Sequence, residues 1–325
     1  MPSVPLVRVV RSGLEESIHE GDIAVVDGEG RLVAFAGEPG RPVFARSSMK
    51  PLQATVSLSL ASFDFPDEEV AVMCASHNAE PIHVQTVRSL LRRAGVQEAA
   101  LRCPAMRPWD EETAAASPER RPINSDCSGK HAGMLAGCIA QGWPGESYRE
   151  PDHPLQRAVL DGVTGATGLE AVRVGVDGCG VPVHRVPLWG MARVYAGLVE
   201  PERWGALEPH ARRAALAMMA QPYLVAGRNR VDTAVMEEGG GIVVKAGAEA
   251  LICSSIRDRG LGVAVKIRDG APRAPGPVLI RVLHMLDALD DGQVERLAVY
   301  ARPPVLGGGE QVGEIVVESF DLSRP

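Results

Sequence analysis

The uneven distribution of strand and helix signals along the chain limits the possible folds most strongly. Short β-branched apolar runs between turn residues occupy residues 1–45 and 240–325, whereas residues 46–239 show mainly helical spacing. Strands from both ends of a chain can bury their apolar faces together in one sheet. We therefore predict an α/β fold with a mixed, mostly antiparallel sheet of N- and C-terminal strands, surrounded by helices, in one catalytic domain over residues 1–325.

Turn residues and periodicity place the individual elements. Strands are predicted at residues 4–10, 23–26, 32–36, 70–74, 171–176, 241–244, 250–254, 261–267 and 315–318. Helices are predicted at residues 47–61, 81–94, 130–139, 154–165, 209–219 and 277–289. Residues 99–122 are rich in Pro, Arg and Glu, and we expect an irregular excursion there.

Composition excludes several classes of protein. The net charge of -7 lacks the basic excess that phosphate binding needs, so no nucleic-acid partner is expected. The chain has no apolar run of about 18 residues and no leader-like start, which predicts a protein without a membrane span or export signal. Its six cysteines are thinly spread, which favours a reducing compartment and a cytoplasmic location.

The pair Ser47 and Lys50 is the first candidate for chemistry. The three-residue spacing puts both side chains on one face of a helix. A serine hydroxyl needs an adjacent base to become a nucleophile, and a desolvated lysine can lose its proton and serve as one. The chain has only four lysines among 34 basic residues, which is consistent with lysine being kept for such a role or with a coding bias toward arginine.

Two further motifs follow in an informative order. Ser76-His77-Asn78 comes after the apolar run at 70–74, and Lys245-Ala246-Gly247 comes after another apolar run, so we expect both at strand ends. The order S-x-x-K, S-x-N and K-x-G is that of serine β-lactamases and penicillin-binding proteins. The sequence therefore predicts a pocket where Ser47, Lys50, Ser76 and Lys245 meet.

The thiols of Cys127 and Cys179 lie in glycine-rich segments that also carry an amine, an imidazole and a carboxylate. Two thiolates with further donors would suit zinc. Cytosolic cysteines are also commonly buried as small apolar residues, and the chain has no C-x-x-C spacing. Both interpretations stay open from the residues alone.

Four blocks together resemble the bacterial L-asparaginase II family of the rhizobial type. The blocks are Arg46-Ser47-Ser48-Met49-Lys50-Pro51-Leu52-Gln53, Cys74-Ala75-Ser76-His77-Asn78-Ala79-Glu80-Pro81, Asp126-Cys127-Ser128-Gly129-Lys130-His131-Ala132-Gly133-Met134 and Val176-Asp177-Gly178-Cys179-Gly180-Val181-Pro182. The resemblance implies a fold like serine β-lactamases and glutaminases. It also implies a homodimer that hydrolyses L-asparagine to L-aspartate and ammonia.

The resemblance also implies roles for individual residues. It makes Ser47 with Lys50 one catalytic pair and Ser76 with Lys245 the second. It implies a zinc site, with the ligands Cys127, Lys130 and Cys179. It implies substrate-binding side chains at Arg46, His77, Asn78, Glu80, His131 and Asp177. The family usually has glycine in the middle of the Asn78-Ala79-Glu80 block, where this chain has Ala79.

The expected reaction is a two-step acyl transfer. Ser47, deprotonated by Lys50, attacks the side-chain amide and releases ammonia, and water then cleaves the acyl-enzyme while Ser76 and Lys245 relay protons. Backbone N–H groups at the start of the Ser47 helix would stabilise the oxyanion. Two alternatives remain: a glutaminase or β-lactam or ester hydrolase on this scaffold, and a non-catalytic amino-acid sensor.

Overall fold

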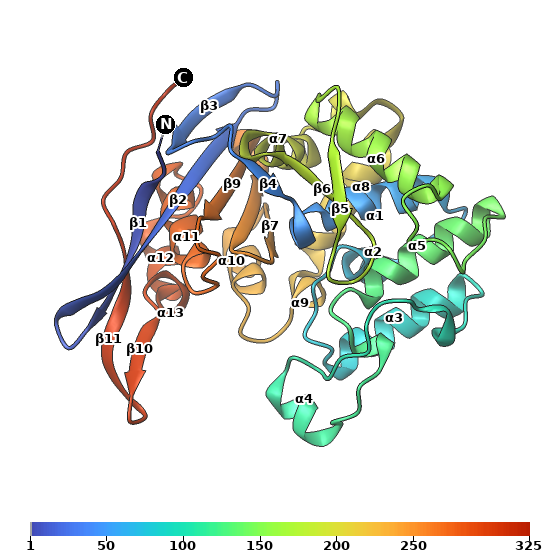
Figure 1. The fold of residues 1–325 in the computed structure, drawn as a ribbon, viewed down its shortest axis with the longest axis horizontal. Helices are drawn as coiled ribbons and strands as arrows, with labels where there is room; N and C mark the ends of the chain where they lie inside the picture. The colour runs from blue at the N-terminus through green and yellow to red at the C-terminus, as the bar shows by residue number, and fades with distance from the viewer. Residues whose placement is uncertain (1) are drawn as a thin grey trace. The chain divides into compact units, whose positions relative to one another are not determined.

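A computed structural model describes residues 2–325, which form two compact units. Unit 1 comprises residues 2–43, 186–200 and 234–325, and unit 2 comprises residues 44–185 and 201–233. The predicted α/β class is confirmed, because each unit combines helices and strands (Figure 1). The prediction that all of these residues form one catalytic domain stays a prediction.

Unit 1 is built on an eight-stranded sheet with the order β10-β11-β1-β2-β9-β8-β7, in which β3 also pairs with β2. The strands are β1 (Val4–Arg11), β2 (Leu14–Val26), β3 (Leu32–Ala36), β7 (Ile242–Gly247), β8 (Leu251–Ile256), β9 (Leu261–Ile267), β10 (Pro304–Gly307) and β11 (Glu310–Val317). Neighbouring strands of this sheet pair antiparallel. Because β1 pairs with β11 and β2 with β9, the prediction of a sheet shared by both ends of the chain is confirmed.

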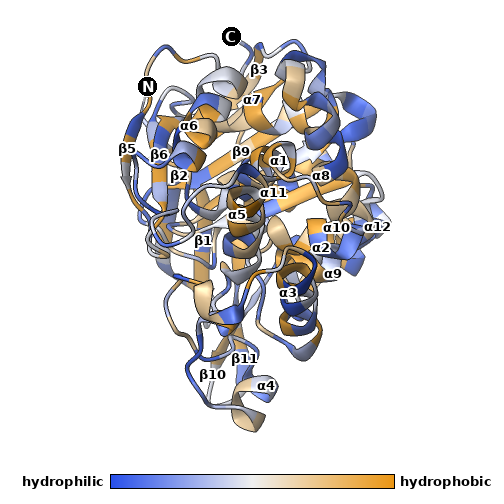
Figure 2. Ribbon diagram, turned by 90° about the vertical axis from the view of Figure 1, so that its right-hand side faces the viewer, coloured by the Kyte–Doolittle hydropathy of each residue, from blue (hydrophilic) through white to orange (hydrophobic). Residues whose placement is uncertain are grey.

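Helices cover both faces of this sheet. The helices of unit 1 are α7 (Leu188–Val199), α11 (Pro275–Met285), α12 (Asp291–Arg296) and α13 (Ala298–Ala301), with the short turn η5 (Arg257–Arg259). All six residues of β8 are buried, and both α7 and α11 pack against β8 and β9. Gly262 permits the contact with α7, because a Cβ there would lie 2.0 Å from Ala192 O. Figure 2 shows the hydrophobic residues that this packing buries along β9.

Unit 2 is mainly helical. Its elements are η1 (Arg46–Met49), α1 (Lys50–Leu60), α2 (Asp67–Met73), α3 (Pro81–Arg93), η2 (Glu98–Ala100), α4 (Glu111–Ala116), η3 (Pro122–Asn124), α5 (Ser128–Gln141), α6 (Pro154–Thr167), β5 (Arg173–Val176), η4 (Pro201–Leu207), α8 (Glu208–Ala220) and α9 (Pro222–Val225). The elements β4 (Pro42–Phe44), β6 (Pro182–Pro187) and α10 (Val231–Gly239) include residues of both units. A three-stranded sheet has the order β4-β6-β5.

Small residues bring α5 close to α2. A Cβ on Gly129 would lie 2.0 Å from Val72 O, and one on Gly133 would lie 2.9 Å from the Met73 side chain. Only glycine therefore fits at position 129, whereas a larger residue at position 133 would require the Met73 side chain to move. The close approach fixes the end of α2, and with it the segment that follows, against the start of α5.

One predicted element has the wrong type. Residues 70–74 were expected to form a strand that leads to Ser76, but residues 70–73 lie in α2. The first turn of this helix follows Pro66 and contains three acidic residues, Asp67, Glu68 and Glu69. Negative charges at a helix N-terminus stabilise the helix. A run of four or five apolar residues does not distinguish a strand from a buried helix.

No helix within residues 2–325 has the length and apolar character needed to cross a bilayer.

Candidate active site

The first motif lies where a 3₁₀ turn passes into a helix. Ser47 belongs to η1, Lys50 begins α1, and the Lys50 N–H donates to Ser47 O. Side chains three residues apart eclipse each other in 3₁₀ geometry, so Ser47 and Lys50 leave the same side of the turn. Pro51 is tolerated because it lies in the first turn of α1, where its missing N–H has no intrahelical partner to lose.

The residue before Ser47 has a strained backbone. Arg46 has a φ of 47°, in the left-handed region that favours glycine. Its side chain is fixed by Asp177, because Arg46 Nε donates to Asp177 Oδ1 at 2.7 Å and the Gly178 N–H donates to the same oxygen at 2.9 Å. Unusual backbone conformations persist where surrounding contacts enforce them, often at functional sites. Arg46 and Asp177 thus set the direction of the turn that presents Ser47.

Lys50 makes a complete set of hydrogen bonds inside unit 2. Its side chain is fully buried, and Nζ donates to Ala75 O at 2.7 Å, Ser76 Oγ at 2.8 Å and Asp126 O at 3.3 Å. Three acceptors match the three protons of an ammonium group. Asp126 Oδ2 lies 3.5 Å from the same nitrogen. The structure therefore joins the first motif to the second through Lys50 and Ser76.

The charges around Lys50 bear on its protonation state. Burial by itself lowers the pKa of this amine, but the negative charge of the Cys127–Cys179 pair and that of Asp126 outweigh burial and raise the pKa above its ordinary value. A raised pKa favours the ammonium form of Lys50 in the resting site, and the neutral amine of the expected mechanism stays a prediction. As an ammonium group, Lys50 must lose a proton before it can act as a base.

The second motif is an extended segment. The Ser76 and Asn78 N–H groups donate to Val225 O and Ala226 O, both at 2.9 Å, while the His77 N–H donates to Asp126 O at 3.3 Å. This alternation is typical of an extended chain, whose side chains two residues apart share a face. Ser76 and Asn78 therefore face one side, and His77 faces the other.

His77 stabilises the back of this segment. Its Nε2 lies 2.9 Å from Ser128 Oγ, and its Nδ1 accepts the Ala79 N–H at 3.1 Å. Burial, followed by the nearby His83 ring, holds the pKa of His77 well below its ordinary value. A neutral imidazole that accepts at Nδ1 and donates at Nε2 satisfies both contacts. His77 thus positions the motif from behind.

Glu80 ends the motif as the N-cap residue of α3. Ala79 has a φ of 61°, a left-handed conformation that glycine adopts with less strain than alanine. The Glu80 carboxylate accepts from the Arg228 N–H at 2.9 Å and from the Tyr223 hydroxyl. Glu80 therefore anchors the second motif to the loop after α9, and its carboxylate is taken up by contacts within unit 2.

The cysteine segments meet in a buried ion pair. Lys130 Nζ donates to Cys179 Sγ at 3.0 Å. A hydrogen bond from Cys127 lowers the pKa of Cys179, and that same bond raises the pKa of Cys127 well above its ordinary value. Burial lowers the pKa of Lys130, but the negative charge that the Cys127–Cys179 pair carries on Cys179 raises this pKa overall. The cluster thus holds a Cys179 thiolate between a thiol and an ammonium group.

The three predicted zinc ligands lie together, so their donor chemistry can be compared with a metal site. Two sulfurs and an amine are donors that zinc accepts once each has lost its proton. Within residues 2–325, no group of three or more His, Cys, Asp or Glu side chains is arranged for a metal ion. The third donor here is Lys130 instead. Zinc would thus replace the protons of Cys127 and Lys130 as the positive charge beside Cys179.

His131 and Asp177 connect this cluster to its surroundings. The fully buried His131 has its Nδ1 2.5 Å from Tyr148 Oη, and burial lowers the pKa of His131 to about 4. Asp177 Oδ2 lies 3.7 Å from Cys179 Sγ, and Asp177 also binds Arg46. A continuous set of contacts therefore runs from Lys130 through Cys179 and Asp177 to the residue before Ser47.

Lys245, the predicted partner of Ser76, belongs to unit 1. It lies in β7 opposite Cys253, is fully buried, and its Nζ donates to Ala246 O at 2.7 Å. The Ser76–Lys245 pair joins residues of different units and stays a prediction. The other predicted site residues all belong to unit 2.

Residues 7–317 match the family model described as L-asparaginase II. The chain belongs to the L-asparaginase II family. A search of curated proteins finds no match to this family member. The match covers all four sequence blocks and supports an amidohydrolase activity, whereas the identity of the substrate is a separate question.

Several solved structures are similar to this L-asparaginase II family member at low identity. A β-lactamase from Mycobacterium bovis is 16% identical over 82% of this chain and 94% of that chain, with a TM-score of 0.47. Mglu in its native form is 15% identical over 84% of this chain and 67% of that chain, with a TM-score of 0.47. Simvastatin synthase from Aspergillus terreus is 13% identical over 76% of this chain and 86% of that chain, with a TM-score of 0.39.

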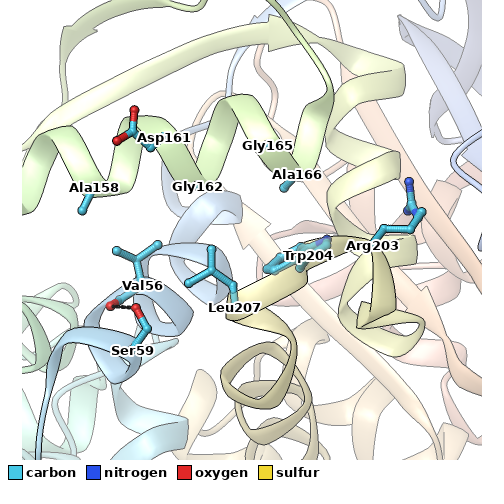
Figure 3. Close-up of a pocket in the computed structure, with 10 residues that line it drawn as sticks. All are labelled: Val56, Ser59, Ala158, Asp161, Gly162, Gly165, Ala166, Arg203, Trp204 and Leu207. Carbon is cyan, nitrogen blue, oxygen red and sulfur yellow. Dashed lines mark hydrogen bonds between the residues drawn. The ribbon is translucent and has the colours of Figure 1, made fainter.

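A cavity of about 340 Å³ in this family member lies away from the motifs (Figure 3). It is lined by residues of α1, α6 and η4, including Ser59, Asp161 and Arg203. The Ser59 hydroxyl donates to Val56 O, as the dashed line in Figure 3 shows, so it is held by the helix backbone. Ser59 follows Lys50 by nine residues, or about 13 Å along α1. This cavity has no serine–lysine pair.

The structure adds residues that sequence reasoning did not select in this family member. Asp126 faces Lys50, Ser128 pairs with His77, and Tyr148 pairs with His131. Asp126 and Ser128 lie in the same sequence block as Cys127 and Lys130, and this proximity could have identified them as candidate site residues. Arg230 contacts Ser76 O and Asn78 Oδ1 from a loop that carries no motif. Only the tertiary structure brings Arg230 to the site.

Proposed function

We propose that this chain hydrolyses L-asparagine to L-aspartate and ammonia through a serine acyl-enzyme. Family membership supports an amidohydrolase. The observation that carries the proposal is the Lys50 ammonium group, which donates to Ser76 Oγ at 2.8 Å and extends from the same turn as Ser47. We infer that Lys50, which binds Ser76 in the resting site, also acts on Ser47 during the reaction.

We assign the nucleophile to Ser47 on grounds of access. Ser47 is half-buried, whereas Ser76 is 5% exposed and its hydroxyl already accepts from Lys50. A nucleophile must reach the substrate carbon, while a proton relay has only to reach its neighbours. Ser47 therefore attacks, and Ser76 holds Lys50 in position and passes protons.

The proton balance begins with the Lys50 ammonium group. Lys50 first gives a proton to the Asp126 carboxylate, whose Oδ2 lies 3.5 Å away and is partly open to solvent. The neutral amine then takes the Ser47 proton as Ser47 Oγ bonds to the side-chain amide carbon. Lys50 returns this proton to the departing nitrogen, and ammonia leaves as the acyl ester forms. Water, deprotonated by the same amine, cleaves the ester and restores the Ser47 hydroxyl.

Further features of the assembled enzyme are proposals too. The Cys127, Lys130 and Cys179 cluster would hold zinc, which would supply a fixed positive charge beside Asp177 and Arg46. We also propose that the enzyme is a cytoplasmic homodimer. The Ser76–Lys245 pair is proposed as the second proton relay. None of these features is needed for the proton balance given above.

Ammonia release by serine variants tests the assignment. We expect S47A to lower ammonia release from asparagine by a factor of about 10⁴ or more, as loss of a serine nucleophile does in other enzymes. S76A should lower it less, because the nucleophile remains. S59A is the matched control, since Ser59 binds only the α1 backbone, and it should keep wild-type activity.

Other outcomes distinguish the alternatives. Wild-type activity in S47A would shift the nucleophile to Ser76. Faster release of ammonia from glutamine than from asparagine would identify a glutaminase. Turnover of a chromogenic β-lactam or ester, with no ammonia from either amide, would place the enzyme among the other hydrolases of this scaffold. Asparagine-dependent thermal stabilisation without turnover of any of these substrates would indicate an amino-acid sensor.

A further inference from the structure

Arg230 differs from the other arginines around the motifs in its partners. Arg228 pairs with Glu80 and Asp110 and with the Glu112 carboxylate, and Arg46 pairs with Asp177. Within residues 2–325, the Arg230 guanidinium contacts only neutral groups. Its Nη1 donates to Asn78 Oδ1 at 2.9 Å and to Ser76 O at 3.3 Å, and its carbon lies 5.6 Å from the centre of the Trp109 ring.

This guanidinium has unused capacity for an anion. It carries five N–H donors, and both of its hydrogen bonds to protein use Nη1. Arg230 is half-buried, and no ion pair joins it to a carboxylate within the part of the chain that the structure describes. Arginine binds a carboxylate through two parallel N–H donors. The Nε and Nη2 side of the guanidinium is therefore available for such an ion.

The position of Arg230 relates it to the reacting groups. Ser76 and Asn78 share one face of the extended segment, with Lys50 bound at Ser76 and Arg230 bound at Asn78. Two residues of extended chain span about 6.6 Å. The carboxylate carbon and the side-chain amide carbon of asparagine are about 4 Å apart when extended. With hydrogen-bond contact at each end, an amino-acid amide spans this face.

The cavity beside Arg230 carries charges of both signs. It has a volume of about 450 Å³ and is lined by Asn78, Trp109, Asp110, Glu111, Glu112, Arg228, Asn229 and Arg230. The indole of Trp109 is 55% exposed and supports the flat face of the guanidinium. The Asp110 and Glu111 carboxylates lie in the same cavity, where they suit an α-ammonium group. The cavity thus complements a zwitterion.

We propose that Arg230 binds the α-carboxylate of the substrate, and that Asn78 and Trp109 position its guanidinium for this. The inference rests on the proposed function, because it assigns one end of an amino-acid amide whose other end lies at the serine–lysine cluster. Arg230 thereby restricts the substrates to amides that carry a free α-carboxylate. It acts on binding and leaves the acyl-transfer chemistry to Ser47 and Lys50.

The first test uses only the wild-type enzyme. Ammonia release is measured from L-asparagine and from 3-aminopropanamide, which is asparagine without its α-carboxylate. We expect kcat/KM to be about 100-fold or more lower for 3-aminopropanamide, because two charge-assisted hydrogen bonds are lost. Similar kcat/KM values for the two amides would overturn the inference. They would leave the proposed function intact, since both amides would be hydrolysed.

The second test separates binding from a merely structural role. In R230M we expect KM for asparagine to rise about 100-fold with kcat within about fivefold of wild type. The KM of R230K for asparagine should lie between those of wild type and R230M, because lysine keeps the positive charge but lacks the paired N–H donors of the guanidinium. For 3-aminopropanamide, R230M and wild type should have equal kcat/KM. An equal loss on both amides, or a loss of kcat alone, would overturn the inference.

Failure of the proposed function gives a different result. A wild-type enzyme that hydrolyses neither asparagine nor glutamine would overturn that function and this inference together. Hydrolysis of asparagine with no effect of R230M would overturn only the inference. Thermal denaturation of each variant, followed by circular dichroism, establishes that the compared proteins are folded.

Discussion

Replacement of Lys50 by methionine should separate stability from activity. Methionine has a similar length and no charge, so the buried side chain keeps most of its packing while the amine is lost. Ala75 O, Ser76 Oγ and Asp126 O would each lose a charged donor, which is worth about 1.5–3 kcal/mol per bond. The cost of burying the ammonium group, several kcal/mol, would be relieved at the same time.

The two effects nearly cancel for stability. The Asp126 side chain is 19% exposed, so its carboxylate keeps some hydration after Lys50 is removed. We expect K50M to lower the free energy of unfolding by about 1–3 kcal/mol, a fraction of the stability of a typical domain. Catalysis has no such compensation. Loss of the general base should lower kcat for asparagine by a factor of about 10³ or more.

Urea denaturation followed by fluorescence measures the first quantity, and ammonia release measures the second. K266M is the matched control, since Lys266 lies in β9 at a half-buried position and donates to Glu249 O. It should retain wild-type kcat. A folded K50M enzyme with more than a tenth of wild-type kcat would refute the role of Lys50 as the base. A K50M chain that does not fold would show that the ammonium group is needed for structure.

Three further predictions follow from particular residues. A79G should raise the free energy of unfolding, measured by urea denaturation, by about 0.5 kcal/mol. The reason is that relief of the strain of the left-handed φ of 61° slightly exceeds the entropy cost of glycine. A decrease in the free energy of unfolding of more than about 1 kcal/mol would contradict this. His184 has a pKa of about 4, lowered first by burial and then by the Lys130 charge, and both of its ring nitrogens lack hydrogen-bond partners. As pH falls from about 6.5 to 4, His184 takes up a proton in the unfolded chain before it does so in the folded protein. The free energy of unfolding should therefore drop by about 3 kcal/mol over that pH window. If H184M showed the same pH dependence as wild type, His184 would not be the group responsible. Zinc binding should release protons from Cys127 and Lys130, which calorimetry in buffers of different ionisation enthalpy would detect. C179S should abolish zinc binding. Zinc binding without proton release, or no zinc binding, would exclude this cluster as a zinc site.

The positions of most elements follow from local sequence alone. Leu32–Ala36 and Leu261–Ile267 form strands with the predicted bounds, because turn residues flank β-branched runs at both ends. The shared sheet also follows from sequence, since apolar strands at the two termini have few other ways to be buried. The helix start at Lys50 was constrained by Pro51, which fits only near such a start.

Chemistry was less predictable than secondary structure. The motifs identified Ser47, Lys50 and Ser76, because unusual residues at fixed spacing are visible in one dimension. They did not give the protonation state of Lys50. That state depends on Asp126 and Cys127, which come about 76 residues later in the chain and approach Lys50 only after folding. The net effect of burial and charge needs distances that no sequence pattern contains.

Short segments of the chain encode the class of fold, the serine and lysine motifs and the family, so each of these can be recognised without coordinates. Tertiary structure decided which serine Lys50 binds, how Cys179 is charged, and that Arg230 lies beside Asn78. The physical reason is the range of the interactions. Propensity and spacing act between near neighbours, whereas ion pairs and hydrogen bonds act between groups that only packing brings within about 3 Å.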